Sequence, residues 1–280
     1  MFANDKNILI VIPARYDSSR LPGKPLLKIK GIEMIKRVAS IASYMCDNNA
    51  DCTYIVATDD DRIINFCVDN NINATLTSKD CRNGTERCRD VVERLKLNPK
   101  LVINLQGDNP LCPPWVIQDI IDAWKKIDAD VYTPCVRLNW DEYDRLIEAK
   151  KKTPFSGTTV IEDKNGFALA FSKNVIPAIR KPEQARQILK TSPVIRHIGL
   201  YAYTCKTLKE YKCNEESLYE KNCIEGLEQM RFLYNGYKIK LVSVDYRNRE
   251  TASGVDSIED IRRVEEIIEK YGEFEQNSVF

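Results

Sequence analysis

The loop that follows residues 7–12 carries three basic side chains. Residues 7–12 read NILIVI, an apolar, β-branched run that is typical of a buried strand. The loop behind it contains Arg15, Arg20 and Lys24. Arginine binds phosphate oxygens in pairs and lysine binds them as a point charge, so these cations and the hydroxyl of Ser19 would suit a polyphosphate. A solvated basic loop is the alternative, because neither of the usual glycine-rich phosphate motifs is present.

Two aspartates stand where a metal ion could bind. Asp108 follows an apolar run, in the sequence LQGDNP, and Asp256 precedes the last helical pattern, in SGVDS. Mg²⁺ prefers one or two carboxylates together with phosphate oxygens, so a triphosphate beside these side chains would complete a site for it. The alternatives are an Asx turn at Asp108 and a favourable charge at a helix N-terminus for Asp256.

Other polar residues allow a functional and a structural interpretation. The sequence NGTER at 83–87 indicates a helix start with Thr85 as the N-cap and Arg87 as a surface or ligand-binding residue. The single histidine, His197, is either a half-buried structural residue or a hydrogen-bonding substrate ligand. A third set, spaced for one face of a helix, consists of Glu225, Glu228 and Gln229. A solvated helix face is its usual explanation.

The elements that must position these residues alternate over the first half of the chain. Apolar runs predict strands at 7–12, 52–60, 73–78, 100–110 and 129–138. Helical spacing predicts helices at 32–45, 62–71, 85–95 and 114–127. This alternation predicts an α/β fold with a mainly parallel sheet flanked by helices. Ligands of such sheets bind at the carboxyl ends of the strands, where the basic loop and Asp108 lie.

The second half of the chain has a different pattern. Residues 156–174 predict a β-hairpin with its turn at 164–166, and residues 196–204 alternate as a strand does. Helices are expected around 206–212 and 223–235, and a strand at 237–246. The last helix, 257–272, is strongly amphipathic, with Ser257 as N-cap and Asp260 at the acidic position of a capping box.

Composition narrows the class of protein. The chain has 42 basic and 41 acidic residues, which gives a net charge of +1, whereas a nucleic-acid coat protein usually has a basic excess. Its ten cysteines contain no C-x-x-C pair, so we expect reduced, mostly buried thiols and a cytoplasmic protein. No signal peptide or continuous apolar span of membrane length is present, so we expect no membrane partner. The balanced charge leads us to expect no nucleic-acid partner.

Together the motifs resemble one family over about residues 7–270. They occur in the order seen in the bacterial 3-deoxy-manno-octulosonate cytidylyltransferases, the CMP-Kdo synthetases. In this chain they read IPARYDSSRLPGKPL, ATDD, NGTER, LQGDNP, FALAFSKNVIP, RHIGLYAY, GLEQMRFLYNGYKI and SGVDSIEDIRRV. The first motif is shared with other sugar nucleotidyltransferases, whereas RHIGLY and LEQ-R are more specific to this family.

The resemblance implies one Rossmann-like nucleotidyltransferase domain over 1–280, with a small β-rich extension that forms a homodimer. Its nucleotide-binding half would cover about 7–138, its acceptor-binding and dimerisation half about 139–250, and its closing helix 251–272. CTP would be the donor, Mg²⁺ the cofactor and a 3-deoxy-ulosonic acid, Kdo or a close relative, the acceptor. The reaction would transfer CMP to the anomeric hydroxyl and release pyrophosphate, for bacterial surface glycans such as lipopolysaccharide.

The resemblance also implies roles for individual residues. The expected catalytic residues are Arg15, Lys24, Asp108 and Asp256, of which Asp108 and Asp256 would ligate Mg²⁺. Nucleotide binding would fall to Arg15, Ser19, Arg20, Lys24, Thr85, Arg87 and Gln106. The acceptor would be bound by Arg180, His197, Tyr201, Glu228 and Gln229.

Three departures from the family pattern lie mostly towards the acceptor. Asn109 stands where the family usually has glutamate, and Lys173 stands where it has arginine, which loses bidentate geometry. A lysine that the family has near Thr158 and Thr159 is missing. The acceptor could therefore be another acidic sugar, such as 8-amino-Kdo, or a non-ulosonate. A nucleotide-binding homologue without activity is less consistent with the retained pair of aspartates.

Overall fold

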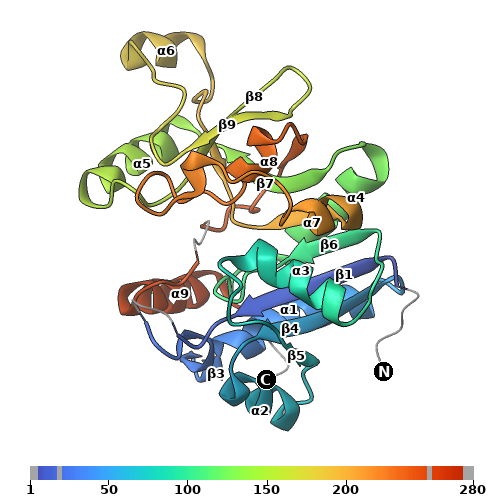
Figure 1. The fold of residues 1–280 in the computed structure, drawn as a ribbon. Helices are drawn as coiled ribbons and strands as arrows, with labels where there is room; N and C mark the ends of the chain where they lie inside the picture. The colour runs from blue at the N-terminus through green and yellow to red at the C-terminus, as the bar shows by residue number, and fades with distance from the viewer. Residues whose placement is uncertain (1–5, 18–20, 251–253, 274–280) are drawn as a thin grey trace. The chain divides into compact units, whose positions relative to one another are not determined.

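The structure, a computed structural model, describes residues 6–17, 21–250 and 254–273. The chain forms two compact units, each built from segments far apart in sequence. The first unit comprises Met1–Asp119, Leu200–Lys212 and Tyr246–Phe280, and the second comprises Ile120–Gly199 and Cys213–Asp245. Figure 1 shows their elements in chain order.

The first unit contains a mainly parallel set of strands. β1 (Ile8–Ala14) pairs in parallel with β4 (Cys52–Thr58) on one side and with β6 (Leu101–Asn104) on the other. β5 (Ala74–Leu76) continues the parallel order beyond β4, and β11 (Tyr201–Thr204) runs antiparallel to β6. Residues 8–12 of β1 are at most 1% exposed, as expected for a central strand that is covered on both faces.

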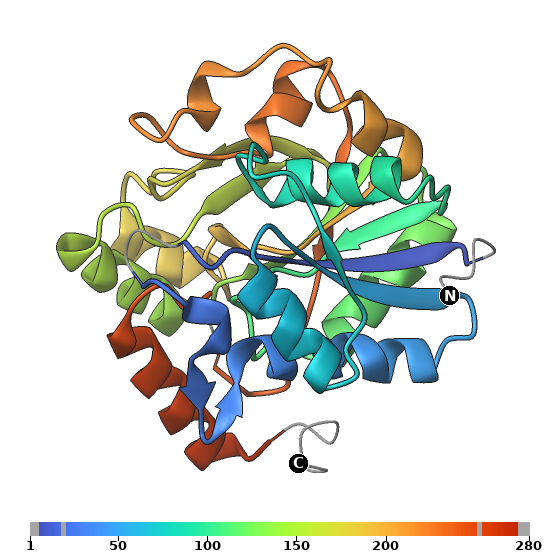
Figure 2. The ribbon, with the colours of Figure 1, turned by 60° about the horizontal axis from the view of Figure 1, so that its bottom comes forward.

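Helices cover both faces of these strands. Figure 2 shows α3 on one face and α1 on the other. The helices of this unit are α1 (Met34–Asp47), α2 (Asp61–Asp69), α3 (Gly84–Arg94), α7 (Cys205–Glu210), α9 (Ile258–Tyr271) and the 3-10 helix η1 (Lys24–Leu26). A separate ribbon is formed by β2 (Lys28–Ile29) and β3 (Ile32–Glu33). α4 (Pro114–Lys126) carries the chain from the first unit into the second.

The last helix closes an apolar cluster of the first unit. Val264, Ile267 and Ile268 of α9 pack with buried residues that include Ile29 and Met34. The predicted capping box is confirmed: the Ser257 side chain accepts from Asp260 N, and the Asp260 carboxylate accepts from Ser257 N. The amphipathic pattern of the sequence therefore sets both the start and the buried face of α9.

The second unit is mainly antiparallel. β7 (Val131–Arg137) pairs in parallel with β12 (Ile239–Ser243) and antiparallel with β10 (Ile195–His197). β8 (Thr159–Glu162) pairs antiparallel with β10. β8 and β9 (Ala168–Ser172) form the predicted hairpin, whose turn contains Gly166 at φ +75°. The helices of this unit are α5 (Trp140–Lys152), α6 (Pro182–Ile188), α8 (Met230–Tyr234) and the 3-10 helix η2 (Leu218–Glu220).

The predicted fold class is confirmed. Among the described residues, one predicted α-helix is wrong and two α-helices were not predicted. The helix expected at 223–235 is reduced to the five residues of α8. α5 and α6 lie in segments for which no element was predicted, and α5 begins with a capping box formed by Asn139 and Glu142. All ten cysteines are free thiols and eight of them are not exposed, as predicted.

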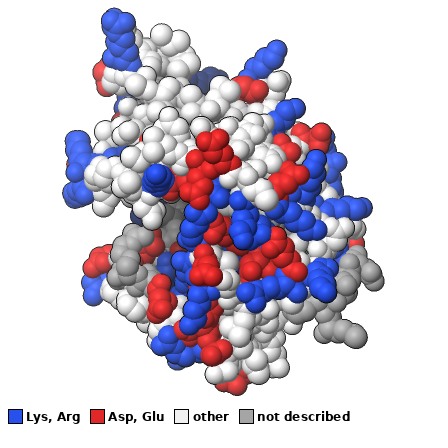
Figure 3. All heavy atoms as spheres, viewed as in Figure 1, with Lys and Arg blue, Asp and Glu red and all other residues white. Residues whose placement is uncertain are grey.

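The face of the molecule drawn in Figure 3 carries charges of both signs. On the face drawn in Figure 3, acidic and basic side chains are interspersed, in keeping with the net charge of +1. Across residues 6–17, 21–250 and 254–273, no helix combines the length and the apolar character needed to cross a bilayer.

Candidate functional site

The carboxyl ends of four parallel strands in the first unit carry candidate residues. Arg15 follows β1, Asp59 follows β4 and Thr77 follows β5. Gln106 and Asp108 lie two and four residues beyond Asn104, the last residue of β6. The parallel register brings these ends to one edge of the strands, where the sequence predicted ligand binding.

Lys24 joins the two aspartates that were predicted to bind a metal ion. Its Nζ lies 2.7 Å from Oδ2 of Asp108 and 3.3 Å from Oδ1 of Asp256. Burial alone would lower the pKa of Lys24, but the charges and hydrogen bonds of Asp108 and Asp256 outweigh it and raise the pKa. Lys24 is 84 and 232 positions away from its two partners, so only the fold assembles this triad.

Close backbone packing fixes Asp108. Gly107 N donates to Pro13 O at 3.1 Å, and a Cβ on Gly107 would lie 2.5 Å from that oxygen. On the other side, Val255 N donates to Asp108 O at 2.8 Å, and a Cβ on Gly254 would lie 3.0 Å from Asp108 Oδ1. Glycine at 107 lets the strand end approach β1, which positions the carboxylate beside Lys24.

The described part of the basic loop is folded back on itself. Gly23 has φ +71°, which favours glycine, and its N–H donates to Tyr16 O at 2.9 Å. The Tyr16 ring lies under the guanidinium of Arg62, 3.2 Å from its centroid. These contacts set the position from which Lys24 enters the site. Ser19 and Arg20, which were predicted to bind the nucleotide, lie outside the described residues.

Arg15 and Arg87 bring two guanidinium groups together. Arg87 is 1% exposed, its Nη2 lies 2.7 Å from Asp59 Oδ2, and its Nη1 donates to Thr77 Oγ1. Burial and then the positive charge of Arg87 lower the pKa of Arg15. Nη2 of Arg15 is buried and has no hydrogen-bond partner within the described part of the chain. An anion at this point would satisfy that donor.

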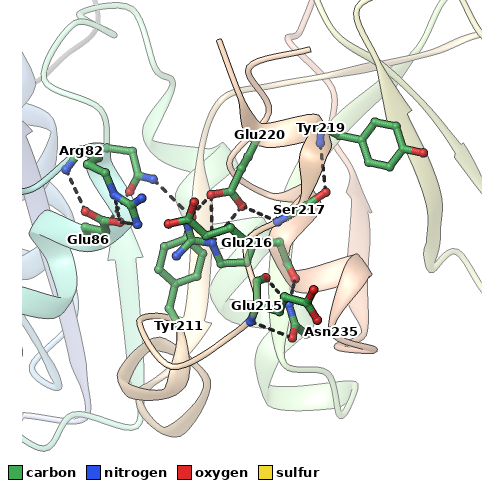
Figure 4. Close-up of polar contacts among 11 residues, drawn as sticks. Arg82, Glu86, Tyr211, Glu215, Glu216, Ser217, Tyr219, Glu220 and Asn235 are labelled. Carbon is green, nitrogen blue, oxygen red and sulfur yellow. Dashed lines mark hydrogen bonds and ion pairs between the residues drawn. The ribbon is translucent and has the colours of Figure 1, made fainter. Parts of the chain in front are cut away.

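Thr85 does not cap α3, so that prediction is wrong. The N-cap is Asn83, whose side chain accepts from Glu86 N at 2.9 Å. The Thr85 hydroxyl is buried and lies 2.7 Å from the hydroxyl of Tyr203. Glu86 is also paired with Arg82, as Figure 4 shows, so the first turn of α3 is fixed by side chains.

A chain of amide and hydroxyl groups leads from Gln106 to the interior. Gln106 Nε2 donates to Asn104 Oδ1 at 3.0 Å, and Asn104 Nδ2 donates to the Tyr203 hydroxyl at 3.2 Å. The Tyr203 ring stacks on Tyr201 at 6.1 Å between centroids. A Cβ on Gly84 would lie 2.6 Å from Gln106 Nε2, so glycine leaves room for this amide. Tyr201, which was predicted to face the acceptor, is 5% exposed.

His197 is a buried, neutral residue of the second unit. Its Nε2 is hydrogen-bonded to Thr133 Oγ1 at 2.9 Å, and its ring meets Phe171 edge-on at 5.2 Å. Burial, and after it the charge of Lys173, lower the pKa of His197 to about 3. The imidazole is therefore uncharged at neutral pH and can act there as a hydrogen-bonding group.

The predicted helix face made of Glu225, Glu228 and Gln229 is not formed. α8 begins only at Met230, and Gly226 adopts φ +62°, which interrupts a helix. Glu225 instead accepts from Ser172 Oγ at 2.9 Å and from Lys173 N at 2.6 Å. Glu225 is thus positioned by a tertiary contact and not by the helix that its spacing predicted.

The other predicted acceptor residues differ in their surroundings. Gln229 is 2% exposed, and its Nε2 has no hydrogen-bond partner among the described residues. Glu228 is half-buried, and Arg180 is exposed just before α6. An unsatisfied buried amide such as that of Gln229 is costly unless a ligand or water pairs with it, so it supports the predicted role.

Residues 215–220, which precede Glu228 and Gln229 in the chain, are held by several hydrogen bonds. Figure 4 shows Ser217 and Glu220 in a capping box at η2, and the backbone of Glu215 bonded in both directions to the Asn235 side chain. Arg231, which is 1% exposed, is paired with Glu220. This anchoring holds both ends of the loop that presents Glu228 and Gln229.

Three residues with clear contacts had no predicted role. Asp59 stood in the acidic end of a predicted strand, which was a usable signal, but its partner Arg87 could not be read from the sequence. Thr77 and Lys150 carried no signal, because each acts through a contact with a distant segment.

Comparison with known proteins agrees with the motifs. A family model described as cytidylyltransferase matches residues 9–239. A 3-deoxy-manno-octulosonate cytidylyltransferase from Maricaulis maris (strain MCS10) is 43% identical, over 95% of this chain and 99% of its own length. The protein of that name from Haemophilus influenzae Rd is 33% identical, over 92% and 97%. A solved structure of CMP:2-keto-3-deoxy-manno-octonic acid synthetase complexed with CTP has 31% identity and a TM-score of 0.79, covering 95% and 99%.

Proposed function

Because the chain belongs to the cytidylyltransferase family, and within it to the 3-deoxy-manno-octulosonate cytidylyltransferases, we propose that it transfers CMP from CTP to a 3-deoxy-ulosonic acid. The acceptor is Kdo or a close relative, and pyrophosphate is released. The observations that carry the proposal are the Lys24–Asp108–Asp256 triad and the unsatisfied Nη2 of Arg15, where Asp108 and Arg15 both follow the carboxyl ends of parallel strands.

Arg15 and Lys24 bind the triphosphate in this proposal. The buried Nη2 of Arg15 is a donor without a partner in the described part of the chain, and a phosphate oxygen supplies one. Lys24 carries a full charge, because its carboxylate partners raise its pKa. A phosphate oxygen can replace a carboxylate as the partner of Lys24 when the nucleotide binds.

Asp108 and Asp256 suit Mg²⁺. Their oxygens already converge on one cation, the ammonium of Lys24, and carboxylate oxygens are the hard donors that Mg²⁺ prefers. Within the described residues no group of three possible ligands is present, so phosphate and water oxygens would complete the coordination. Bound there, Mg²⁺ would neutralise phosphate charge and lower the pKa of the sugar hydroxyl.

The reaction is an in-line displacement at the α-phosphorus of CTP. The anomeric hydroxyl oxygen forms a bond to phosphorus, the bond from phosphorus to the bridging oxygen of the β-phosphate breaks, and pyrophosphate leaves with that electron pair. The hydroxyl proton passes to solvent. Arg15 and Lys24 hold the leaving group and offset its charge, so positioning and electrostatics contribute most of the rate and no strong protein base is required.

His197 and Gln229 recognise the acceptor in the second unit. The neutral imidazole can exchange hydrogen bonds with hydroxyl groups, and the buried Nε2 of Gln229 is a donor that a sugar oxygen would satisfy. The family match runs from residue 9 to residue 239 and so includes both units, which supports their working as one cytidylyltransferase domain.

The protein acts as a homodimer in the cytoplasm in this proposal, and its product serves surface glycan synthesis. Several large apolar side chains of the second unit are exposed, which supports a covered surface: Leu169, Leu218, Tyr219, Ile224 and Tyr234. The ten free cysteines agree with a reducing compartment. Sedimentation of the purified protein tests the dimer, and a monomer at micromolar concentration would contradict it.

Pyrophosphate release from CTP tests the function. The purified protein is assayed with Mg²⁺ and with Kdo, 8-amino-Kdo, a sialic acid or no acceptor, and each product is identified by its mass. We expect a CMP conjugate of Kdo or a close relative, and no release without acceptor or when a chelator removes Mg²⁺. Turnover only with a non-ulosonate would overturn the acceptor class, and no turnover at all would overturn the proposed activity.

A further inference from the structure

The backbone of Lys173 is held by a charged side chain on each side. Lys173 N–H donates to Oε2 of Glu225 at 2.6 Å, and Lys173 O accepts from Nζ of Lys150. The second oxygen of Glu225 accepts from Ser172 Oγ at 2.9 Å. Hydrogen bonds to charged groups are stronger than those between neutral groups, so this pair, which we call the charge clamp, fixes the peptide groups of Lys173.

Lys150 reaches Lys173 from the last turn of α5 and also gathers the loop that follows the helix. Its Nζ donates to Ser156 O at 2.8 Å, to Gly157 O at 3.0 Å and to Pro154 O at 3.3 Å. One ammonium thereby ties the end of β9 to the loop before β8. The next two residues of α5, Lys151 and Lys152, are exposed lysines.

A third side chain completes the fixation of this turn. Thr159 Oγ1 donates to Asn174 O at 2.7 Å and accepts from Ile176 N at 3.0 Å. Thr159 lies near the place where the family pattern has a lysine, and its hydroxyl has a structural role there. Residues 172–176 are therefore bonded to three separate segments through Thr159, Lys150 and Glu225.

The clamped turn presents positive charge next to His197. The charge of Lys173 lowers the pKa of His197, and the charges of Lys173 and Arg196 lower that of Lys150, after burial in each case. The negative charge of Glu225 acts in the opposite direction and raises the pKa of Lys150. Lys173 therefore lies close enough to His197 and Lys150 for its charge to act on both, and a shift of its backbone would move that charge relative to them.

We propose that Lys150 and Glu225 are positioning residues that orient Lys173 toward the carboxylate of the acceptor. The inference rests on the proposed function, because it assigns the acid group of that acceptor to Lys173. Lysine cannot bind a carboxylate in the bidentate way that arginine does, so it depends more on where its backbone is held. The clamp supplies that placement in a chain that lacks both the arginine and the lysine of the family pattern.

Steady-state kinetics of Lys150→Met and Glu225→Gln test the clamp, with Lys152→Met as the matched control. Methionine keeps the length of the side chain but loses all donors, and glutamine accepts one hydrogen bond where the carboxylate accepts two. We expect KM for the acceptor to rise about tenfold in both variants, the effect of one lost charged hydrogen bond. KM for CTP and the Lys152→Met variant should remain as in wild type. Equal KM values for the acceptor in Lys150→Met and Lys152→Met, or a parallel rise in KM for CTP, would overturn the proposal.

Amide hydrogen exchange gives a second readout that does not depend on the acceptor. In wild type the Lys173 amide should exchange slowly, and in both clamp variants about tenfold faster or more, while β7 amides keep their protection. If the Lys173 amide exchanges as slowly in both variants as in wild type, the clamp is refuted. Protection of the β7 amides shows whether each variant is folded. If wild-type protein turns over no acid, the proposed function fails, whereas the exchange result still decides whether the clamp exists.

Discussion

The strand-end site of the first unit and the clamped turn of the second unit are built in opposite ways. In the first unit, Lys24 and its two carboxylates are partly open to solvent, with side-chain exposures of 13%, 30% and 41%. In the second unit, His197 is 8% exposed and neutral, and the charges of Lys150 and Glu225 are used on backbone groups.

The difference agrees with the ligands that the proposed function assigns to each region. A triphosphate and a metal ion carry large charge, so their site needs ions that can exchange partners when the ligands arrive. A sugar acid presents many hydroxyls and one carboxylate, so its site needs donors and acceptors fixed in direction. Accordingly, a substitution that removes a charge should have its largest effect in the first unit. Acid should lower the stability of the protein through the second unit, and alkali should lower it through the first.

Asp108→Asn should have the largest effect. The substitution removes the nearer partner of Lys24 and one of the two carboxylates proposed to bind Mg²⁺, so we expect kcat to fall by roughly 10²–10³-fold, as when one charge-stabilising group is removed from an active site. The measurement is CTP turnover at saturating Mg²⁺. Asp69→Asn, at an exposed aspartate of α2, is the control. Near-full activity of Asp108→Asn would refute the metal assignment.

Asp59→Asn should have the next largest effect and act on stability. It leaves the buried guanidinium of Arg87 near Arg15 without its carboxylate, and an uncompensated charge of this kind costs about 3 kcal/mol in the free energy of unfolding. Urea titration at pH 7 measures the loss, and CTP should restore part of it by supplying negative charge. The control is Asp61→Asn, at an exposed aspartate of the same segment. A loss no larger than that of the control would show that Asp59 does not hold Arg87.

The sequence predicted the first unit well because its candidate residues lie directly beyond strands that can be recognised from their apolar runs. An apolar run identifies each strand, and the residues after it lie at the carboxyl edge of the strands, which is how the sequence placed Arg15 and Asp108 there. The contacts within that edge were not predictable, since Asp59 meets Arg87 across 28 positions and Lys24 meets Asp256 across 232. Periodicity carries no information about such pairs.

The second unit was predicted less well because its loops are ordered by tertiary contacts. Helical spacing favoured a helix through Glu225 and Gln229, yet the left-handed Gly226 and the bonds from Glu225 to residues 172 and 173 override it. The lysine-rich segment at 150–152 gave no sign that one ammonium of the three binds four carbonyl oxygens. The hairpin, which is a local structure, was predicted correctly from its turn residues, and the strands predicted at 129–138 and 237–246 are present as β7 and β12.

Acid should destabilise the protein through His197, the only histidine of the chain. Its pKa is lowered from 6.5 to about 3 in the folded protein, so the unfolded chain binds a proton between these values and the folded protein does not. The stabilisation is complete above pH 6.5 and is lost as pH falls, by about 2 kcal/mol at pH 5. Urea titrations at pH 8 and pH 5 measure this, with His197→Gln as comparison. Equal losses in the two proteins would place the acid sensitivity elsewhere.

Alkali should give a smaller effect, with the opposite sign, through Lys24 of the first unit. Its pKa is raised above 10.5 in the folded protein, so its stabilisation is complete below that value and is lost as pH rises through the folded pKa. Because its carboxylate partners are partly exposed, we expect a loss of about 1 kcal/mol or less. The difference in the free energy of unfolding between wild type and Lys24→Gln, followed from pH 8 to pH 11.5, isolates it from the tyrosines and thiols that also titrate. A difference that does not shrink as pH rises would mean that Lys24 stabilises the fold by packing rather than by charge. The contrast between a site of exchangeable ion pairs and a site of fixed hydrogen bonds would then fail.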